Sequence, residues 1–169
     1  MRPAANSFKV RREVRRNGKF AWALVCDVDG VLTDGKFHYS SEGKVQKVFG
    51  SHDADALKKS TFFDEILFVS ADKRGKKISL KRLQDMGQTL SIRDSAARLE
   101  LVRELMLTKN VVFVGDSFSD IPSMKAATIS AAPRGSYPSA FKIAKLKLSL
   151  RGGEGALCEL LELFEARGK

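Results

Sequence analysis

The sequence predicts an α/β fold in which helices cover both faces of a mostly parallel β-sheet. Three short apolar runs, at residues 21–26, 65–70 and 111–114, resemble strands that are buried on both faces, as in a parallel sheet. Segments with helical spacing of apolar side chains follow these runs, which is the alternation expected of crossover connections. The chain has 169 residues, a length that suits one domain built around one sheet.

Weaker signals complete the alternation along the chain. Further strands are predicted at residues 89–92, 128–131 and 146–150. Helices are predicted at residues 53–59, 73–86, 95–107, 121–127, 138–144 and 154–166. Together these elements predict a three-layer α/β/α sandwich of the Rossmann-like type.

Local signals mark the ends of several elements. Gly87 is expected to end the helix before it, and Ser95 to cap the N-terminus of the next one. Pro122 suits the first turn of the helix in which it lies. Apolar and polar side chains alternate within residues 35–50 on both sides of Ser41–Glu42–Gly43, which predicts a β-hairpin flap. A segment of this length leaves no room for a cap domain.

The net charge of +10 is concentrated in a basic N-terminal arm, residues 1–20, ahead of a domain at residues 21–169. Such an arm can contact a polyanion, but no aromatic platform or recognition motif supports nucleic acid as a partner. No apolar run approaches the ~20 residues of a membrane-spanning helix. No secretory leader is expected, and the two cysteines are too few for a disulfide framework. These two observations predict a cytoplasmic location.

Polar side chains end three of the predicted strands. Asp27, Ser70 and Asp116 each follow an apolar run directly or closely. In a parallel sheet the carboxyl ends of the strands lie at one edge, where ligands bind. We therefore expect these three side chains to converge on one crevice.

Two acidic motifs extend this group. In the first, Asp27 and Asp29 precede Gly30, which permits a turn, and in the second Asp116 and Asp120 are separated by three residues. Either pair alone is also typical of a turn. Four gathered carboxylates are costly without a cation, and oxygen ligands suit Mg²⁺, so the motifs indicate Mg²⁺-assisted phosphoryl transfer.

The residues from Asp27 to Gly35, together with the tail Arg151–Gly152–Gly153–Glu154–Gly155–Ala156, resemble motifs of a known family. The family is the haloacid dehalogenase superfamily of phosphatases. The residues of these motifs are similar to those of its capless subfamily, the 3-deoxy-D-manno-octulosonate 8-phosphate phosphatases and the related nonulosonate 9-phosphate phosphatases. The resemblance covers about residues 21–164.

The resemblance implies a role for each matching residue. Asp27 would be the nucleophile that forms an aspartyl-phosphate, and Asp29 the general acid and then the base. Asp27, Asp116 and the backbone carbonyl of Asp29 would hold Mg²⁺, supported by Asp120. Ser70 would bind the transferring phosphoryl group, and Gly30 would let backbone amides approach it.

The sequence departs from the family pattern at its third motif, where a lysine is usual. Arg98 is the expected substitute, with Arg93 and Lys109 as weaker candidates. Ala71–Asp72 and Ser117 also differ from the family's usual residues. These departures affect the expected substrate more than the chemistry.

A capless domain of this kind is expected to form a homotetramer in which neighbours close each other's sites. The flap and the tail residues Arg151, Gly152 and Gly153 would then border the substrate. The leading hypothesis is a phosphatase of a phosphorylated sugar acid. The alternatives are an inactive assembly domain, of the kind fused to sialic-acid-activating enzymes, and a nucleic-acid-linked protein that uses the arm.

Overall fold

The computed structural model describes residues 21–168, so the predicted basic arm lies outside the described residues. The strands are β1 (Trp22–Asp27), β2 (His38–Ser40), β3 (Gly43–Gln46), β4 (Glu65–Ser70), β5 (Leu90–Ile92), β6 (Asn110–Val114), β7 (Ile129–Arg134) and β8 (Leu146–Arg151). The helices are α1 (His52–Lys59), α2 (Lys76–Asp85), α3 (Ser95–Met106), the 3₁₀ turn η1 (Phe118–Asp120), α4 (Ile121–Ala126), α5 (Pro138–Ile143) and α6 (Ala156–Gly168).

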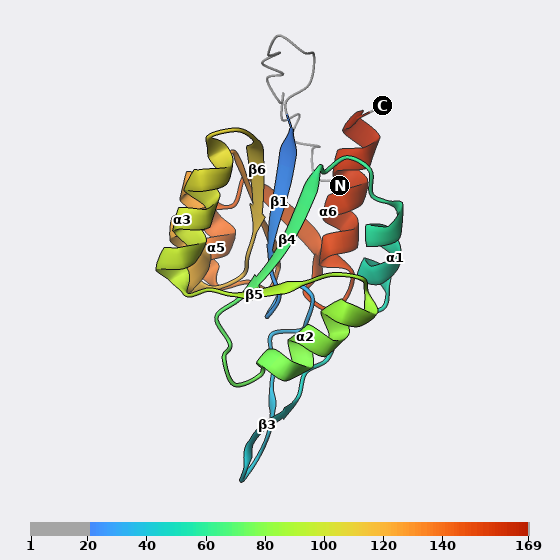
Figure 1. Cartoon of the computed structure of the whole chain (residues 1–169), viewed down its shortest axis with the longest axis vertical. Coiled ribbons are helices and arrows are strands. Elements are labelled where there is room, and N and C mark those ends of the chain that lie inside the picture. The colour runs from blue at the N-terminus through green and yellow to red at the C-terminus, as the bar shows by residue number, and fades with distance from the viewer. Residues whose placement is uncertain (1–20, 169) are drawn as a thin grey trace, which may run out of the picture.

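Six strands form one parallel sheet in the order β5-β4-β1-β6-β7-β8. Helices α1 and α6 cover one face, and α3 and α5 cover the other (Figure 1). The predicted three-layer Rossmann-like sandwich is therefore confirmed. Strands β2 and β3 pair antiparallel as the predicted hairpin, which projects from one end of the sandwich (Figure 1). No cap domain interrupts residues 21–168.

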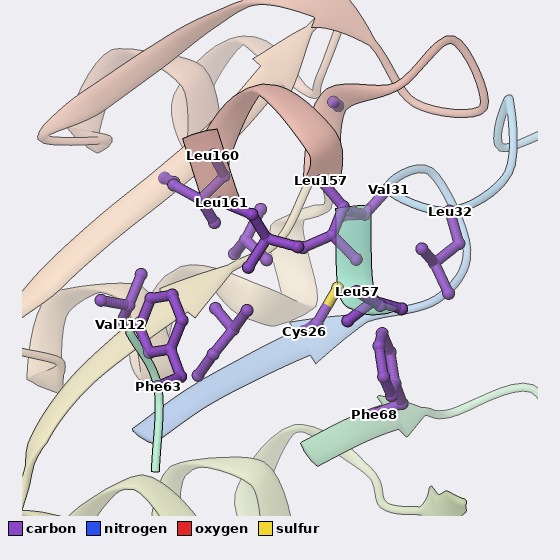
Figure 2. Close-up of a cluster of buried hydrophobic side chains, with 14 of the residues drawn as sticks. Cys26, Val31, Leu32, Leu57, Phe63, Phe68, Val112, Leu157, Leu160 and Leu161 are labelled. Carbon is purple, nitrogen blue, oxygen red and sulfur yellow. The ribbon is translucent and has the colours of Figure 1, made fainter. Parts of the chain in front are cut away.

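Two apolar cores lie on the two faces of the sheet. Figure 2 shows the first, in which Leu57 of α1 and Leu157 of α6 lie over Cys26 of β1 and Phe68 of β4. The second core gathers Val25, Val102, Phe113, Met124 and Ala140, among others, beneath α3, α4 and α5. Because both faces are dry, the central strands are rigid platforms for whatever follows their carboxyl ends. No helix within residues 21–168 is long and apolar enough to cross a membrane.

Three local details differ from the sequence predictions. Asp94, not Ser95, caps α3, because its side chain accepts a hydrogen bond from the amide of Ala97. Helix α2 begins at Lys76, three residues after the predicted start at residue 73, and its fully buried positions are Ser79 and Leu83. Strand β7 is longer than the predicted 128–131. The burial of Ser79 has its reason in the site described next.

Candidate active site

The carboxyl edge of the sheet brings the predicted polar residues together. Asp27 ends β1, Ser70 ends β4 and Asp116 lies two residues past β6, and these strands are neighbours in the sheet. Gly30 lets the turn after β1 pass close to Asp116: its φ is +89°, and a Cβ there would lie 2.0 Å from Asp116 Oδ2. The first and second acidic motifs therefore lie in direct contact.

Arg98 lies between two of these carboxylates. Its guanidinium is ion-paired with Asp120 and lies 3.4 Å from Asp27 Oδ1, and all three side chains are at most 5% exposed. Nε of Arg98 also donates to the carbonyl of Arg93, 3.1 Å away. The guanidinium is thus oriented from two directions in the first turn of α3.

Asp120 uses both of its oxygens to organise the second motif. One oxygen pairs with Arg98, and the other accepts hydrogen bonds from the amides of Asp116 and Ser117 and from the Ser117 hydroxyl. Ser117 and Asp120 together form a capping box at the start of η1. Asp120 therefore fixes the loop that carries Asp116.

The electrostatics of this group fit a divalent cation. Carboxylate oxygens of Asp27, Asp116 and Asp120 lie within 4.8 Å of one another, and buried Oδ1 atoms of Asp27 and Asp116 have no hydrogen-bond partner. Burial is the main cause that raises the pKa of Asp27 well above its usual range, and the charge of the nearby Asp120 raises it further. The same two causes raise the pKa of Asp116 to about 7. A hard cation would offset this repulsion, and oxygen donors are its preferred ligands.

Asp29 points away from this cluster and toward the hairpin side. Its Oδ2 accepts a 2.8 Å hydrogen bond from the Ser70 hydroxyl, and its Oδ1 lies 2.6 Å from Nζ of Lys47. The Ser70 hydroxyl in turn accepts a hydrogen bond from the amide of Asp72. The two carboxylates of the first motif therefore face different cations.

Two lysines and Asp72 form the hairpin side of the site. Nζ of Lys44 lies 2.5 Å from Asp72 and 3.3 Å from the centre of the Phe37 ring, and Lys47 lies 2.9 Å from the same carboxylate. Burial alone would raise the pKa of Asp72, but the contacts with Lys44 and Lys47 outweigh it and hold that pKa far below its usual range. The hairpin is thus fastened to the β4–α2 loop within one chain.

A pocket of about 420 Å³ opens between these two sides. Its walls come from the acidic motifs, the hairpin and the β4–α2 loop: Asp27, Asp29, Gly35, Phe37, Lys44, Ala71, Asp72, Arg98, Asp116, Ser117 and Ser119. A pocket of this size suits a small phosphorylated molecule.

The tail packs against the first motif and does not line this pocket. Gly152 is buried, and a Cβ there would lie 2.0 Å from the carbonyl oxygen of Gly30. The amide of Gly153 donates to the carbonyl of Val31. Arg151 is exposed, and its guanidinium lies near Gly135. Gly152 and Gly153 thus support the turn of Gly30 from behind within the same chain.

The other candidate cations lie elsewhere. Lys109 pairs with Glu65 at the start of β4, at the opposite end of the sheet, and Nε of Arg93 donates to Ser91. Sequence reasoning missed Lys47, Lys44 and the pairing role of Asp72. The alternation does not mark Lys47, because the side chain of Val45, which has the same phase, is exposed.

No family model matches the sequence. Among characterised proteins, the chain is 27% identical to a 3-deoxy-D-manno-octulosonate 8-phosphate phosphatase of Yersinia pestis over 146 residues. The alignment covers 83% of this chain and 78% of the relative. The similarity therefore extends over most of both chains.

Solved structures agree with this relationship. The cobalt-bound form of the deoxy-D-mannose-octulosonate 8-phosphate phosphatase of Haemophilus influenzae superposes with a TM-score of 0.71 at 26% identity, covering 87% of this chain and 89% of that one. The Moraxella catarrhalis phosphatase, solved with magnesium, phosphate and the sugar acid, has a TM-score of 0.71 at 22% identity and covers 85% of each chain. At that identity the second likeness shows the fold alone.

Proposed function

We propose that the chain belongs to the haloacid dehalogenase superfamily, with the 3-deoxy-D-manno-octulosonate 8-phosphate phosphatases, and that it is a Mg²⁺-dependent phosphatase of a phosphorylated sugar acid. The substrate would be of the octulosonate 8-phosphate or nonulosonate 9-phosphate type. The observation that carries the proposal is the convergence of Asp27, Asp29, Asp116 and Arg98 on one pocket at the carboxyl edge of the sheet.

The proposed reaction has two steps. In the first, a carboxylate oxygen of Asp27 attacks phosphorus, the bond to the sugar oxygen breaks, and protonated Asp29 gives its proton to that oxygen. In the second, Asp29 takes a proton from a water molecule that attacks the phosphorus of the aspartyl-phosphate. Inorganic phosphate leaves, Asp27 is regenerated, and Asp29 carries the proton for the next turnover.

The chain's own residues suit a resident Mg²⁺ ion. Asp27, Asp116 and the backbone carbonyl of Asp29 would hold it, and Asp120 would support the site by fixing the loop of Asp116. When bound, the ion neutralises charge on the phosphoryl group and on the nucleophile. Similar proteins carry such ions: the Haemophilus structure is cobalt-bound and the Moraxella structure holds magnesium.

Arg98 takes the place of the usual third-motif lysine in this proposal. It is the cation that contacts Asp27, and a guanidinium can donate to a phosphoryl oxygen while keeping Asp120. The Ser70 hydroxyl and the amides near Gly30 would contact the phosphoryl group. Arg151, which is exposed on the tail, would contribute to substrate binding in a neighbouring copy's pocket, and Gly152 and Gly153 would contribute by holding the turn of Gly30.

A homotetramer in the cytoplasm remains part of the proposal. Four large apolar side chains on and beside the hairpin are more than 40% exposed: Phe37, Tyr39, Val45 and Val48. Such a patch is typical of a protein interface. A second copy packed on the hairpin would shield the open side of the pocket from water.

The test is release of inorganic phosphate by purified protein with Mg²⁺. The screen covers 3-deoxy-octulosonate 8-phosphate, nonulosonate 9-phosphates, simple hexose phosphates and p-nitrophenyl phosphate. The proposal expects release that is abolished by Asp27→Asn and by chelation of the metal. Asp64→Asn is a matched control, since Asp64 accepts a hydrogen bond from Trp22 outside the pocket.

Two results would redirect the proposal. If wild-type protein releases phosphate from no substrate, the inactive assembly domain becomes the better hypothesis. If Asp27→Asn keeps its activity, the nucleophile is assigned to the wrong residue. A salt-dependent nucleic-acid binding assay, with and without residues 1–19, tests the remaining alternative.

A further inference from the structure

Lys47 is a buried lysine that the proposed reaction has not yet used. Its side chain is fully covered, although it lies just beyond β3 on a hairpin whose other side chains are mostly exposed. Burial of an ammonium group is costly unless partners replace the lost water. The partners of Lys47 therefore indicate why the charge is there.

Three oxygen atoms surround the ammonium nitrogen. Nζ lies 2.8 Å from Oγ of Ser79, 2.9 Å from Oδ2 of Asp72 and 2.6 Å from Oδ1 of Asp29. The contact with Ser79 is a hydrogen bond, and the contacts with Asp72 and Asp29 are ion pairs. Asp72 and Ser79 alone would fasten the hairpin to the β4–α2 loop and to α2. The third contact reaches the first acidic motif.

The position of Nζ is tightly defined by its surroundings. Gly75 packs so closely that a Cβ there would lie 2.7 Å from Cε of Lys47 and 2.2 Å from Asp72. Ser79 is fully buried, and its hydroxyl oxygen accepts a hydrogen bond from Nζ of Lys47. The lysine therefore presents its charge to Asp29 from a fixed direction.

Asp29 is held from both sides by this arrangement. Ser70 donates to Oδ2, and Lys47 lies against Oδ1. Among residues 21–168, no other cation lies within ion-pairing distance of Asp29, whereas Arg98 contacts Asp27 and Asp120. The orientation of the Asp29 carboxyl group thus depends on the Ser70 hydroxyl and on one lysine from the hairpin.

We propose that Lys47 is a positioning residue for general acid–base catalysis by Asp29. The inference rests on the proposed function, because it concerns the step in which Asp29 protonates the leaving oxygen. Lys47 itself gains and loses no proton in the reaction. It holds the Asp29 carboxyl group at the angle from which its proton reaches the sugar oxygen, and from which the carboxylate later receives a proton from water.

A comparison of kcat/KM for two leaving groups can distinguish a positioning role of Lys47 from a purely structural one. A sugar alkoxide is a poor leaving group that needs a proton, whereas p-nitrophenolate leaves without one. The parameter kcat/KM reports the steps up to cleavage of the phosphate ester. A change that misplaces Asp29 therefore lowers kcat/KM for the sugar phosphate and spares the aryl phosphate.

The experiment compares Lys47→Met with Lys81→Met on the best sugar acid phosphate of the screen and on p-nitrophenyl phosphate. Lys81 is the control because it also forms an ion pair with an aspartate, but it is exposed and lies outside the pocket lining. We expect Lys47→Met to lower kcat/KM about 10²-fold for the sugar phosphate and only about threefold for the aryl phosphate. Lys81→Met should leave both values unchanged, and Lys47→Arg should restore part of the sugar phosphate activity.

Every outcome decides the proposal. Equal losses on the two substrates for Lys47→Met, or no loss, overturn the positioning role while leaving the phosphatase proposal intact. Wild-type protein that hydrolyses neither substrate overturns both. If Lys47→Met does not fold, as judged by circular dichroism, Ser79→Ala replaces it. That variant removes one contact to Nζ, and it should show a smaller loss confined to the sugar phosphate.

Discussion

Two buried cations hold the two carboxylates of the first motif, and they belong to different parts of the molecule. Arg98 comes from α3, is oriented by the carbonyl of Arg93 and contacts Asp27. Lys47 comes from the end of the hairpin and contacts Asp29. The cation beside the nucleophile therefore comes from the packed sandwich, and the cation beside the acid–base residue comes from a surface hairpin.

This division has a consequence for specificity. The chemistry of the nucleophile is common to all substrates of such a site, whereas the leaving group differs from one substrate to another. The hairpin supplies both the cation beside Asp29 and the pocket walls at Phe37 and Lys44. Changes in the hairpin can thus alter the accepted leaving group without disturbing the sheet edge.

The largest effect is expected from Arg98→Met. The change leaves Asp27 and Asp120 as buried carboxylates without their cation, which costs about 3–5 kcal/mol when a buried pair is broken. Loss of a donor at the phosphoryl group should lower kcat by about 10²–10³-fold on sugar and aryl phosphates alike. Urea unfolding and steady-state kinetics measure the two effects.

Arg93→Met is the control for this prediction. The side chain of Arg93 contacts Ser91, while the contact with Arg98 uses the backbone carbonyl. Its removal should change stability by less than about 1 kcal/mol. A larger loss of activity in Arg93→Met than in Arg98→Met would move the third-motif role to Arg93.

The next largest effect is the dependence of stability on pH and Mg²⁺, which involves Asp116 in the acidic group that Arg98 contacts. Burial and Asp120 raise the pKa of Asp116 to about 7, so the folded protein without metal binds a proton there that the unfolded chain releases near pH 4. This contribution to stability is complete below about pH 4 and is lost as the pH rises through 7. Mg²⁺ binds the ionised carboxylate, so its stabilising effect should grow over the same range.

Thermal unfolding with Mg²⁺ or with chelator, at pH values from 5.5 to 8.5, measures this linkage. The rise in Tm caused by Mg²⁺ should be largest at the highest pH, and the apparent Kd for Mg²⁺ should weaken by up to about tenfold per pH unit below 7. Asp116→Asn should remove most of the effect. A shift in Tm that is the same at every pH would contradict the assignment of Asp116 as a ligand.

A smaller effect, common to both sides, is expected from Gly152→Ala. The new Cβ would press on the carbonyl of Gly30, which follows Asp29 in the first motif, and overpacking of this kind costs about 1–3 kcal/mol. The kcat/KM should fall by the same factor for sugar and aryl phosphates. Gly87→Ala is the control, since that glycine has φ +70° with open space around it, so it should lower stability without a specific loss of activity.

The sequence was informative where local patterns determine the geometry. Apolar runs that end in Asp27, Ser70 and near Asp116 are sufficient to place these residues, because parallel strands align their carboxyl ends. The contacts of Lys47 were not predicted, since its partners Asp29, Ser79 and Asp72 come from three separate segments. A lysine in a polar hairpin is usually solvated.

The same limit applies to the tail and to Asp120. A glycine-rich segment before a helix predicts a loop, but the contact of Gly152 with Gly30 depends on how β8 leaves the sheet. From the sequence, Asp120 is expected to support the metal site. In the structure both of its oxygens have protein partners, so its part is to hold Arg98 and the loop of Asp116.

The smallest effect tests whether burial, not distance, gives the hairpin lysines their importance. Lys44–Asp72 and Lys81–Asp85 are both 2.5 Å ion pairs, but the first pair is 5% and 14% exposed and the second 73% and 49%. Lys81→Met should cost no more than about 0.5 kcal/mol and leave kcat/KM unchanged, because water and side-chain entropy offset an exposed pair. Lys44→Met should cost more, since it leaves Asp72 with Lys47 as its one ion-pair partner among the described residues. Urea unfolding of the two variants measures the difference, and equal losses would show that the hairpin lysines act no differently from surface lysines.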